Sequence, residues 1–147
     1  MPEVLPAAAQ DMVAIRALLE RSGLPTSDLD SARPDFVLIR ENGQVIAAGA
    51  LQRFGSSALL RSLVVAPDRR ERGLGQAVVS ELERVARMAH INQLILLTQT
   101  AAEFFAHQDY RVIARSSAPQ DMQGSDEFRS LCPSSATCMA KSLPDAG

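Results

Sequence analysis

The chain has 147 residues, of which 46% are hydrophobic and 22% charged, and its formal net charge is −2. These values are typical of one globular domain, so we expect a single domain over residues 1–147. The slightly negative charge argues against a nucleic-acid partner, and no apolar run reaches the ~20 residues that cross a bilayer. The N-terminus has no basic segment before an apolar one, so the sequence predicts a cytoplasmic protein without a membrane partner.

The first expected element is a short strand at residues 4–5. Apolar residues then recur at helical spacing over residues 10–22, and Gly23 ends that helix. The following segment, PTSDLDSARP at 25–34, predicts a helical turn or a loop.

Two β-rich runs flank Asn42-Gly43 in the segment FVLIRENGQVIAAGAL. This pair is favoured in two-residue type I′ hairpins. A third run, residues 58–65, follows a turn around Gly55. The three runs therefore predict an antiparallel meander.

From Leu74 the apolar spacing becomes that of a helix, which we expect to end near His90. Residues 93–98, QLILLT, predict a strand that is covered on both faces. A short helix, two strands and one helical turn are expected after it, at 101–108, 110–114, 136–143 and 126–131, respectively. This order of elements predicts a mixed α/β fold.

The stretch RSLVVAPDRRERGLGQAVV, residues 61–79, places a charged loop with two glycines between a strand and a helix. A helix N-terminus presents unpaired N–H groups and about half a positive charge. Gly73 and Gly75 allow close approach of a phosphate, and Arg70 and Arg72 add charged donors. An anion site is therefore predicted; the alternative is a solvated loop whose glycines only turn the chain. Glu71 is expected to point outward, toward Arg69 or Arg72.

The residues LVVAPDRRERGLGQAVV, together with LILLTQTAAEFFAHQDYRV downstream, resemble the GCN5-related N-acetyltransferases (GNAT). The resemblance implies the GNAT fold, a central and mostly antiparallel sheet flanked by helices, with strands four and five splayed apart. It implies acetyl-CoA as co-substrate, with no metal. The residues that it assigns to CoA are Leu63, Val64, Val65, Arg70, Glu71, Arg72, Gly73, Leu74, Gly75, Gln76, Phe104 and Phe105.

The resemblance also implies direct attack by an amine on the thioester, with the oxyanion held by a backbone N–H of Val64 or Val65. Many members carry a glutamate base where this chain has Arg61, and an arginine cannot act as a base in proteins. The base therefore stays open: His107 is a weak candidate, and Glu41, Glu103 and water are alternatives. Phe105 stands where the family often has a tyrosine that acts as the general acid and protonates the leaving thiolate. Tyr110 is expected in the core.

A closer resemblance is carried by LLRSLVVAP, LLTQTAAEFFAHQDY and LCPSSATCMAKSL, which are similar to small acetyltransferases encoded in arsenic-resistance operons. It implies an acceptor amino group on a small amino acid or an amino-acid-like, arsenic-containing compound. Arg61 is the residue expected to bind the acceptor's carboxylate; the alternative is a solvated strand face. Thr98 is expected near the ligand, and Thr100 is expected to cap the next helix with Glu103.

Two other functions stay open on the sequence. A protein or peptide N-acetyltransferase would need an open acceptor groove, and a non-catalytic CoA-binding sensor would explain the missing glutamate and tyrosine. Cys132 and Cys138 have no histidine nearby, so zinc is not expected and both thiols should be reduced. A homodimer, common among the proteins that this chain resembles, is the assembly to test.

Overall fold

The protein is described from a computed structural model that covers residues 2–144, so Met1 and residues 145–147 of the predicted domain lie outside the described residues. The chain divides into two compact units. The first comprises Met1–Gln52 and Leu60–Val85, and the second comprises Arg53–Leu59 and Ala86–Gly147.

A mostly antiparallel sheet of seven strands, in the order β1-β2-β3-β4-β5-β7-β6, is formed by the described residues. The strands are β1 Leu5–Pro6, β2 Asp35–Glu41, β3 Gln44–Phe54, β4 Ser57–Val65, β5 Gln93–Thr98, β6 Arg111–Val112 and β7 Thr137–Ser142. One pair, β4 with β5, is parallel, over Ser57–Gln93 to Leu59–Ile95. The predicted mixed α/β fold is confirmed.

Nine short or long helical segments accompany the described strands. The α-helices are α1 Met12–Arg21, α2 Leu29–Ala32, α3 Leu74–Met88, α4 Ala102–His107 and α5 Gln120–Gln123. Three turns are 3-10 helical, η1 Ala9–Asp11, η2 Pro67–Arg69 and η3 Arg115–Ser117, and η4 Glu127–Leu131 is a π-helix. No helix within residues 2–144 is long and apolar enough to cross a membrane.

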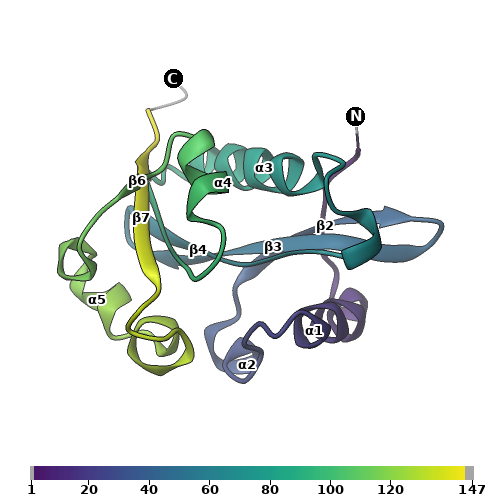
Figure 1. The fold of residues 1–147 in the computed structure, drawn as a ribbon, viewed down its shortest axis with the longest axis horizontal. Helices are drawn as coiled ribbons and strands as arrows, with labels where there is room; N and C mark the ends of the chain where they lie inside the picture. Colours follow the sequence, from purple (N-terminus) through teal and green to yellow (C-terminus); the bar gives the residue numbers. More distant parts are fainter. Residues whose placement is uncertain (1, 145–147) are drawn as a thin grey trace. The chain divides into compact units, whose positions relative to one another are not determined.

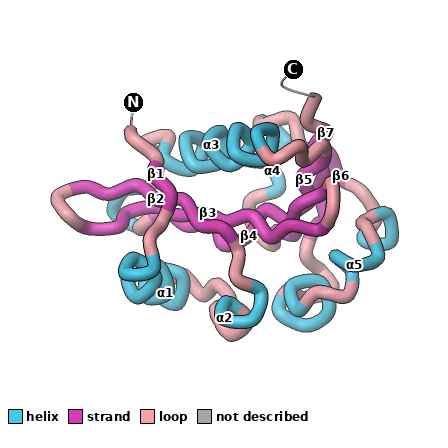
Figure 2. Tube along the Cα trace, turned by 180° about the vertical axis from the view of Figure 1, so that it is seen from behind, coloured by secondary structure: helices cyan, strands magenta, loops and turns pink. Residues whose placement is uncertain are grey.

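In the first unit, β2 and β3 form the predicted hairpin. Asn42 and Gly43 have φ angles of 53° and 78°, so both central residues are left-handed, as a type I′ turn requires. Helices α1 and α2 cover one face of these strands and α3 covers the other (Figure 1; Figure 2 shows the same from behind). Three of the apolar residues expected on α1, Ile15, Leu18 and Leu19, are fully buried, and Met12 is half-buried.

Helix α3 lies unusually close to β3 at Gly49. A Cβ atom added to Gly49 would stand 2.8 Å from Cγ1 of Val78 and 3.1 Å from Cδ1 of Leu82, both on α3. Val78 is β-branched and stiff, so it cannot rotate out of the way cheaply. Glycine at position 49 therefore sets the distance between helix and strand.

In the second unit, β5 pairs with β7 along its whole length, from Gln93–Ser142 to Thr98–Thr137. A cluster of buried side chains surrounds this pair: Leu59, Ile95, Ala118, Met122, Phe128, Cys138 and Ala140. The helical turn expected at 126–131 is observed as η4, whereas α5, just before it, was not expected from the sequence. Met122 on α5 is fully buried, so a single apolar anchor holds this helix of four residues.

We predict that Gly49→Ala destabilises the protein by about 1–3 kcal/mol, the usual range for overpacking of a well-packed core. Gly124→Ala is the matched control, because its added Cβ would meet nothing nearer than Asp121 O at 3.5 Å. Urea denaturation followed by circular dichroism measures both. Equal midpoints for the two variants would contradict close packing at Gly49.

The two cysteines differ in exposure. Cys138 is buried, and Cys132 is half-buried and donates its S–H to Oε2 of Glu127 at 3.0 Å. Burial raises the pKa of the Cys138 thiol, an effect that Arg115 partly offsets. Since the thiolate is the reactive form, Cys138 is poorly reactive in the folded protein.

Thiol titration should therefore detect one reactive cysteine in the native protein at pH 8 and two after denaturation. Cys132→Ser should reduce the native value to nearly zero. A native Cys132→Ser protein that still reacts rapidly would show that Cys138 is accessible.

Candidate active site

The segment between β4 and α3, which we call the arginine loop (residues 66–73), lies in the first unit. It begins as an ordered turn: the N–H of Ala66 donates to Ile46 O at 2.8 Å, and that of Arg69 donates to Ala66 O at 2.9 Å. Pro67 opens the 3-10 turn η2, where its fixed φ is compatible with the helical start. The loop is thus anchored to β3 on its strand side.

The second half of the arginine loop turns through two left-handed residues. Glu71 has φ 67° and Gly73 has φ 76°. Backbones of this kind point neighbouring N–H groups to a common side and bind anions. The carbonyl of Gly73 accepts the N–H of Ala77 at 3.1 Å, so α3 starts directly after this turn with its first N–H groups free of intrahelical partners.

The space beside this turn suits a phosphate. A Cβ at Gly73 would meet no atom within 4 Å, so the backbone there borders open space. Arg70, Glu71, Arg72 and Gln76 are exposed around it, whereas Leu74 is buried beneath it. CoA's pyrophosphate would need hydrogen-bond donors of this kind: the N–H groups of an exposed helix N-terminus and of a left-handed turn, and adjacent guanidinium groups.

Two arginines of the loop are held by a carboxylate that the sequence suggested only as an alternative base. Glu41, the last residue of β2, accepts hydrogen bonds from Nε of Arg69 at 2.9 Å and from Nη2 of Arg72 at 3.2 Å. Arg69 also binds Asp68 at 2.6 Å. Glu71 is exposed, in agreement with its expected outward orientation, while Arg69 and Arg72 both pair with Glu41.

Strand β4 contains an irregularity just before the residues expected to bind the thioester. Ser62 has φ 57°, a left-handed conformation that costs a non-glycine residue about 1–3 kcal/mol. It lies within the strand, immediately before Leu63, Val64 and Val65. Arg70 follows the strand and donates from Nε to Val65 O at 3.3 Å.

Arg61, on the other side of Ser62, is not solvated. Its side chain is 1% exposed and binds Asp28, whose side chain is 3% exposed. Nη1 and Nη2 donate to the two carboxylate oxygens at 2.6 and 2.7 Å, and Nη1 also donates to Gln52 Oε1 at 3.0 Å. The solvated-face alternative is wrong, and the carboxylate at this guanidinium is that of Asp28; binding of a substrate carboxylate by Arg61 stays a prediction.

The remaining predicted site residues belong to the second unit. Oγ1 of Thr98 accepts the N–H of Ala101 at 3.0 Å, so Thr98 closes the turn into α4. The expected cap by Thr100 is wrong, since the N-cap residue of α4 is Ala101 and has no side-chain cap bond.

Aromatic rings define the inner side of α4. The rings of Phe104 and Phe105 meet edge to face at 5.0 Å, and Phe105 meets Tyr110 at 5.4 Å. Tyr110 is buried, which confirms its expected place in the core. His107 and Glu103 are exposed on α4, so their roles as bases stay predictions.

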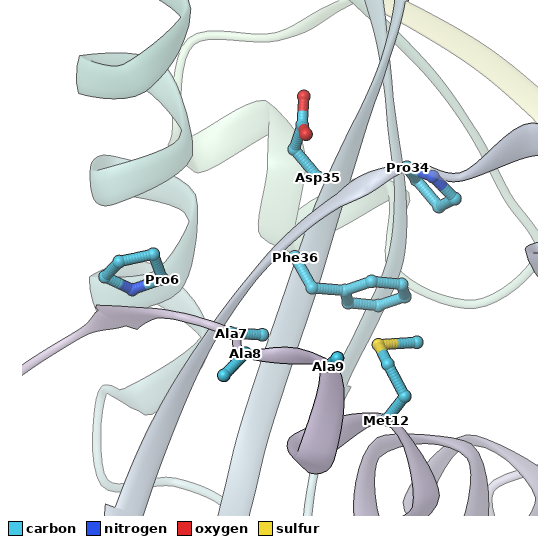
Figure 3. Close-up of a pocket in the computed structure, with 8 residues that line it drawn as sticks. All are labelled: Pro6, Ala7, Ala8, Ala9, Met12, Pro34, Asp35 and Phe36. Atoms are coloured by element: carbon cyan, nitrogen blue, oxygen red, sulfur yellow. The ribbon is translucent and has the colours of Figure 1, made fainter.

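A separate cavity of about 290 Å³ lies in the first unit at the start of β2. Figure 3 shows the Phe36 ring and the Met12 thioether turned into it, with the Asp35 carboxylate turned away. Its lining is Pro6, Ala7, Ala8, Ala9, Met12, Pro34, Asp35 and Phe36, none of which is a predicted site residue. A lining of apolar side chains and one carboxylate does not suit a phosphate.

Residues 32–112 match the family model described as the acetyltransferase (GNAT) domain, over more than half of the chain. The chain belongs to this family. It is therefore an acetyltransferase domain, and the arginine loop and the irregular β4 both lie inside the matched residues.

Solved structures share the fold. The N-acetylglutamate synthase of Neisseria gonorrhoeae, complexed with coenzyme A and N-acetyl-glutamate, matches with TM-score 0.84 and 19% identity over 98% of this chain and 35% of its own. Our chain thus spans about a third of that enzyme. Rv2747 from Mycobacterium tuberculosis, also complexed with CoA, matches with TM-score 0.83 and 25% identity over 97% of this chain and 100% of its own.

A protein-modifying enzyme has the same fold. The ribosomal-protein-S18-alanine N-acetyltransferase from Escherichia coli matches with TM-score 0.75 and 18% identity over 100% of this chain and 97% of its own. At such identities the similarity shows the fold alone.

We predict that Glu71→Gly leaves CoA affinity the same or slightly higher and stabilises the fold by up to about 1 kcal/mol, because glycine adopts a positive φ without strain. Glu71→Gln is the matched control: it removes the charge but keeps the Cβ. Calorimetric CoA binding and urea denaturation measure the two effects. A large loss of affinity in Glu71→Gly would contradict binding through the backbone.

Proposed function

We propose that this domain transfers the acetyl group of acetyl-CoA directly to the amino group of a small amino acid or an amino-acid-like compound, with arsenic-containing amino acids among the acceptors. The observation that carries the proposal is the left-handed turn at Glu71 and Gly73 at the open N-terminus of α3. In a chain of the acetyltransferase (GNAT) family, this is where CoA's pyrophosphate would bind.

The backbone N–H groups from Arg70 to Gly75 would hold the pyrophosphate, with Arg70 and Arg72 as charged donors. The backbone of Leu63 and Val65 would pair with the pantetheine arm in the manner of an added strand. Contributions of Gln76, Phe104 and Phe105 to CoA binding, and of Thr98 to substrate binding, remain part of the proposal.

Acetyl-CoA supplies the activated acetyl carbonyl. The chain's contribution is a fixed N–H donor, from Val64 or Val65, for the oxygen of that carbonyl as negative charge develops on it. One such donor is worth about 10²–10³ in rate. The amine attacks the carbonyl carbon and its proton passes to water or to His107. The C–S bond then breaks and CoA leaves as the thiolate; positioning supplies much of the remaining acceleration.

Two features support an amino-acid acceptor. The segments LLTQTAAEFFAHQDY and LCPSSATCMAKSL resemble the arsenic-resistance acetyltransferases, and the fold is similar to that of an N-acetylglutamate synthase. The similarity to the S18-alanine N-acetyltransferase supports the second candidate, a protein or peptide acceptor. A single domain over residues 1–147, a cytoplasmic location, a homodimer, and the lack of nucleic-acid or membrane partners are further parts of the proposal.

The acceptor can be identified by CoA thiol release from acetyl-CoA. The panel should contain the standard amino acids, amino acids with an arsenic-containing side chain, a peptide with N-terminal alanine, and no acceptor. Turnover with free amino acids supports the proposal, and turnover with the peptide alone supports the second candidate. Tight CoA binding without turnover of any acceptor would refute the proposed enzymatic activity and support a non-catalytic CoA-binding sensor.

The arginine loop can be tested by Gly73→Ala, which we expect to weaken CoA binding about tenfold. Alanine tolerates φ 76° poorly, and its methyl group would enter the open space of the proposed phosphate site. Gly55→Ala is the matched control, since Gly55 has φ 64° and equally open surroundings in the β3–β4 turn. We expect Gly55→Ala to destabilise the fold similarly but to bind CoA normally, as measured by calorimetry; equal CoA affinities of the two variants would contradict the site.

A further inference from the structure

The buried ion pair between Asp28 and Arg61 is joined directly to the irregularity in β4. Arg61 immediately precedes Ser62, and its Nε donates to Ser62 Oγ at 3.2 Å. The same guanidinium is fixed by Asp28 through two bonds and by Gln52 through a third. The left-handed residue is thus held by its own neighbour's side chain.

Stability alone gives a weak reason for such a pair. Removing two charges from water costs several kcal/mol per ion, and apolar residues of similar volume often stabilise a fold as well or better. A bidentate ion pair is directional, unlike apolar contacts, because its two parallel hydrogen bonds fix the planar guanidinium in one orientation. The Asp28–Arg61 pair therefore fixes an angle as well as a distance.

Asp28 itself is attached to the helices on its side of the sheet. Its carbonyl accepts the N–H of Ala32 at 2.8 Å and that of Ser31 at 3.1 Å, at the start of α2. Its side chain makes no cap bond to α2, so both carboxylate oxygens serve Arg61. Asp28 is thus held in place by α2, and it in turn orients Arg61, whose Nε binds Ser62.

We propose that Asp28 and Arg61 are positioning residues for acetyl transfer. By holding the left-handed turn at Ser62, the pair aims the N–H groups of Val64 and Val65 at the acetyl oxygen. This rests on the proposed function, in which one of these N–H groups is the oxyanion donor. A displacement of about 1 Å at such a donor can lower the rate about 100-fold.

The first test is the double variant Asp28→Leu with Arg61→Met, which removes both charges and keeps an apolar volume. We expect a melting temperature within about 4 °C of wild type, a kcat at least about 30-fold lower, and KM values for acetyl-CoA and acceptor within about twofold. A double variant with wild-type kcat would overturn the proposal. An increase confined to the acceptor KM would also overturn it, because Arg61 would then bind substrate.

Arg61→Lys covers the case in which the double variant does not fold. Lysine keeps a positive charge for Asp28 but is a point charge that cannot form the planar fork. We expect a folded protein whose kcat is at least about tenfold lower when assayed well below its melting temperature. Asp30→Asn is the matched control, because Asp30 lies on α2 in an exposed pair with Arg16 at 2.5 Å and should leave kcat unchanged.

Amide hydrogen exchange separates this proposal from the proposed function. If the pair holds the strand, the amides of residues 63–65 should exchange at least about tenfold faster in Arg61→Lys than in Asp30→Asn. Equal exchange rates would overturn the positioning role even if no acceptor is found. Faster exchange in Arg61→Lys, combined with a wild-type protein that turns over no acceptor, would refute the reaction while keeping the pair's hold on β4.

Discussion

The close contact between α3 and β3 at Gly49 is the constraint on which the candidate site depends. A Cβ atom added to Gly49 would lie 3.4 Å from Cδ1 of Leu63 on β4, in addition to its close contacts with Val78 and Leu82 on α3. Helix α3, strand β3 and the end of β4 therefore meet at one point. The arginine loop connects two ends that this packing fixes, which allows a short, charged segment to keep a strained backbone.

Much of the fold could be predicted because its signals are local. The Asn42-Gly43 turn needs only two residues in sequence, and the helical spacing from Leu74 is contained in one segment. Strand β5 was predicted over 93–98 and is observed as Gln93–Thr98. Helix ends were less accurate: α3 stops at Met88, and His90 follows with φ 61°. The arginine loop was also recognisable from its order of residue types.

The contacts that organise the candidate site could not be predicted, because they join residues far apart in the chain. Asp28 and Arg61 are 33 positions apart, and Arg69 is 28 positions from Glu41. Nothing in the spacing of these residues indicates pairing. The error at the start of α4 has a different cause. Thr98, not the expected Thr100, accepts the N–H that closes this turn, and the choice depends on turn geometry, which the residue types TQT do not determine.

Glu41 changes what the arginine loop offers to a ligand. The three arginines of the loop, Arg69, Arg70 and Arg72, are matched by three carboxylates, Asp68, Glu71 and Glu41. The arginine loop and Glu41 together therefore carry no net charge. Long-range steering of an anion by such a site is weak, since steering depends on net charge beyond the Debye length, about 8 Å in physiological salt. Capture of CoA would then depend on short-range N–H groups, and its association rate should vary little with ionic strength, unlike that of a purely arginine-based phosphate site.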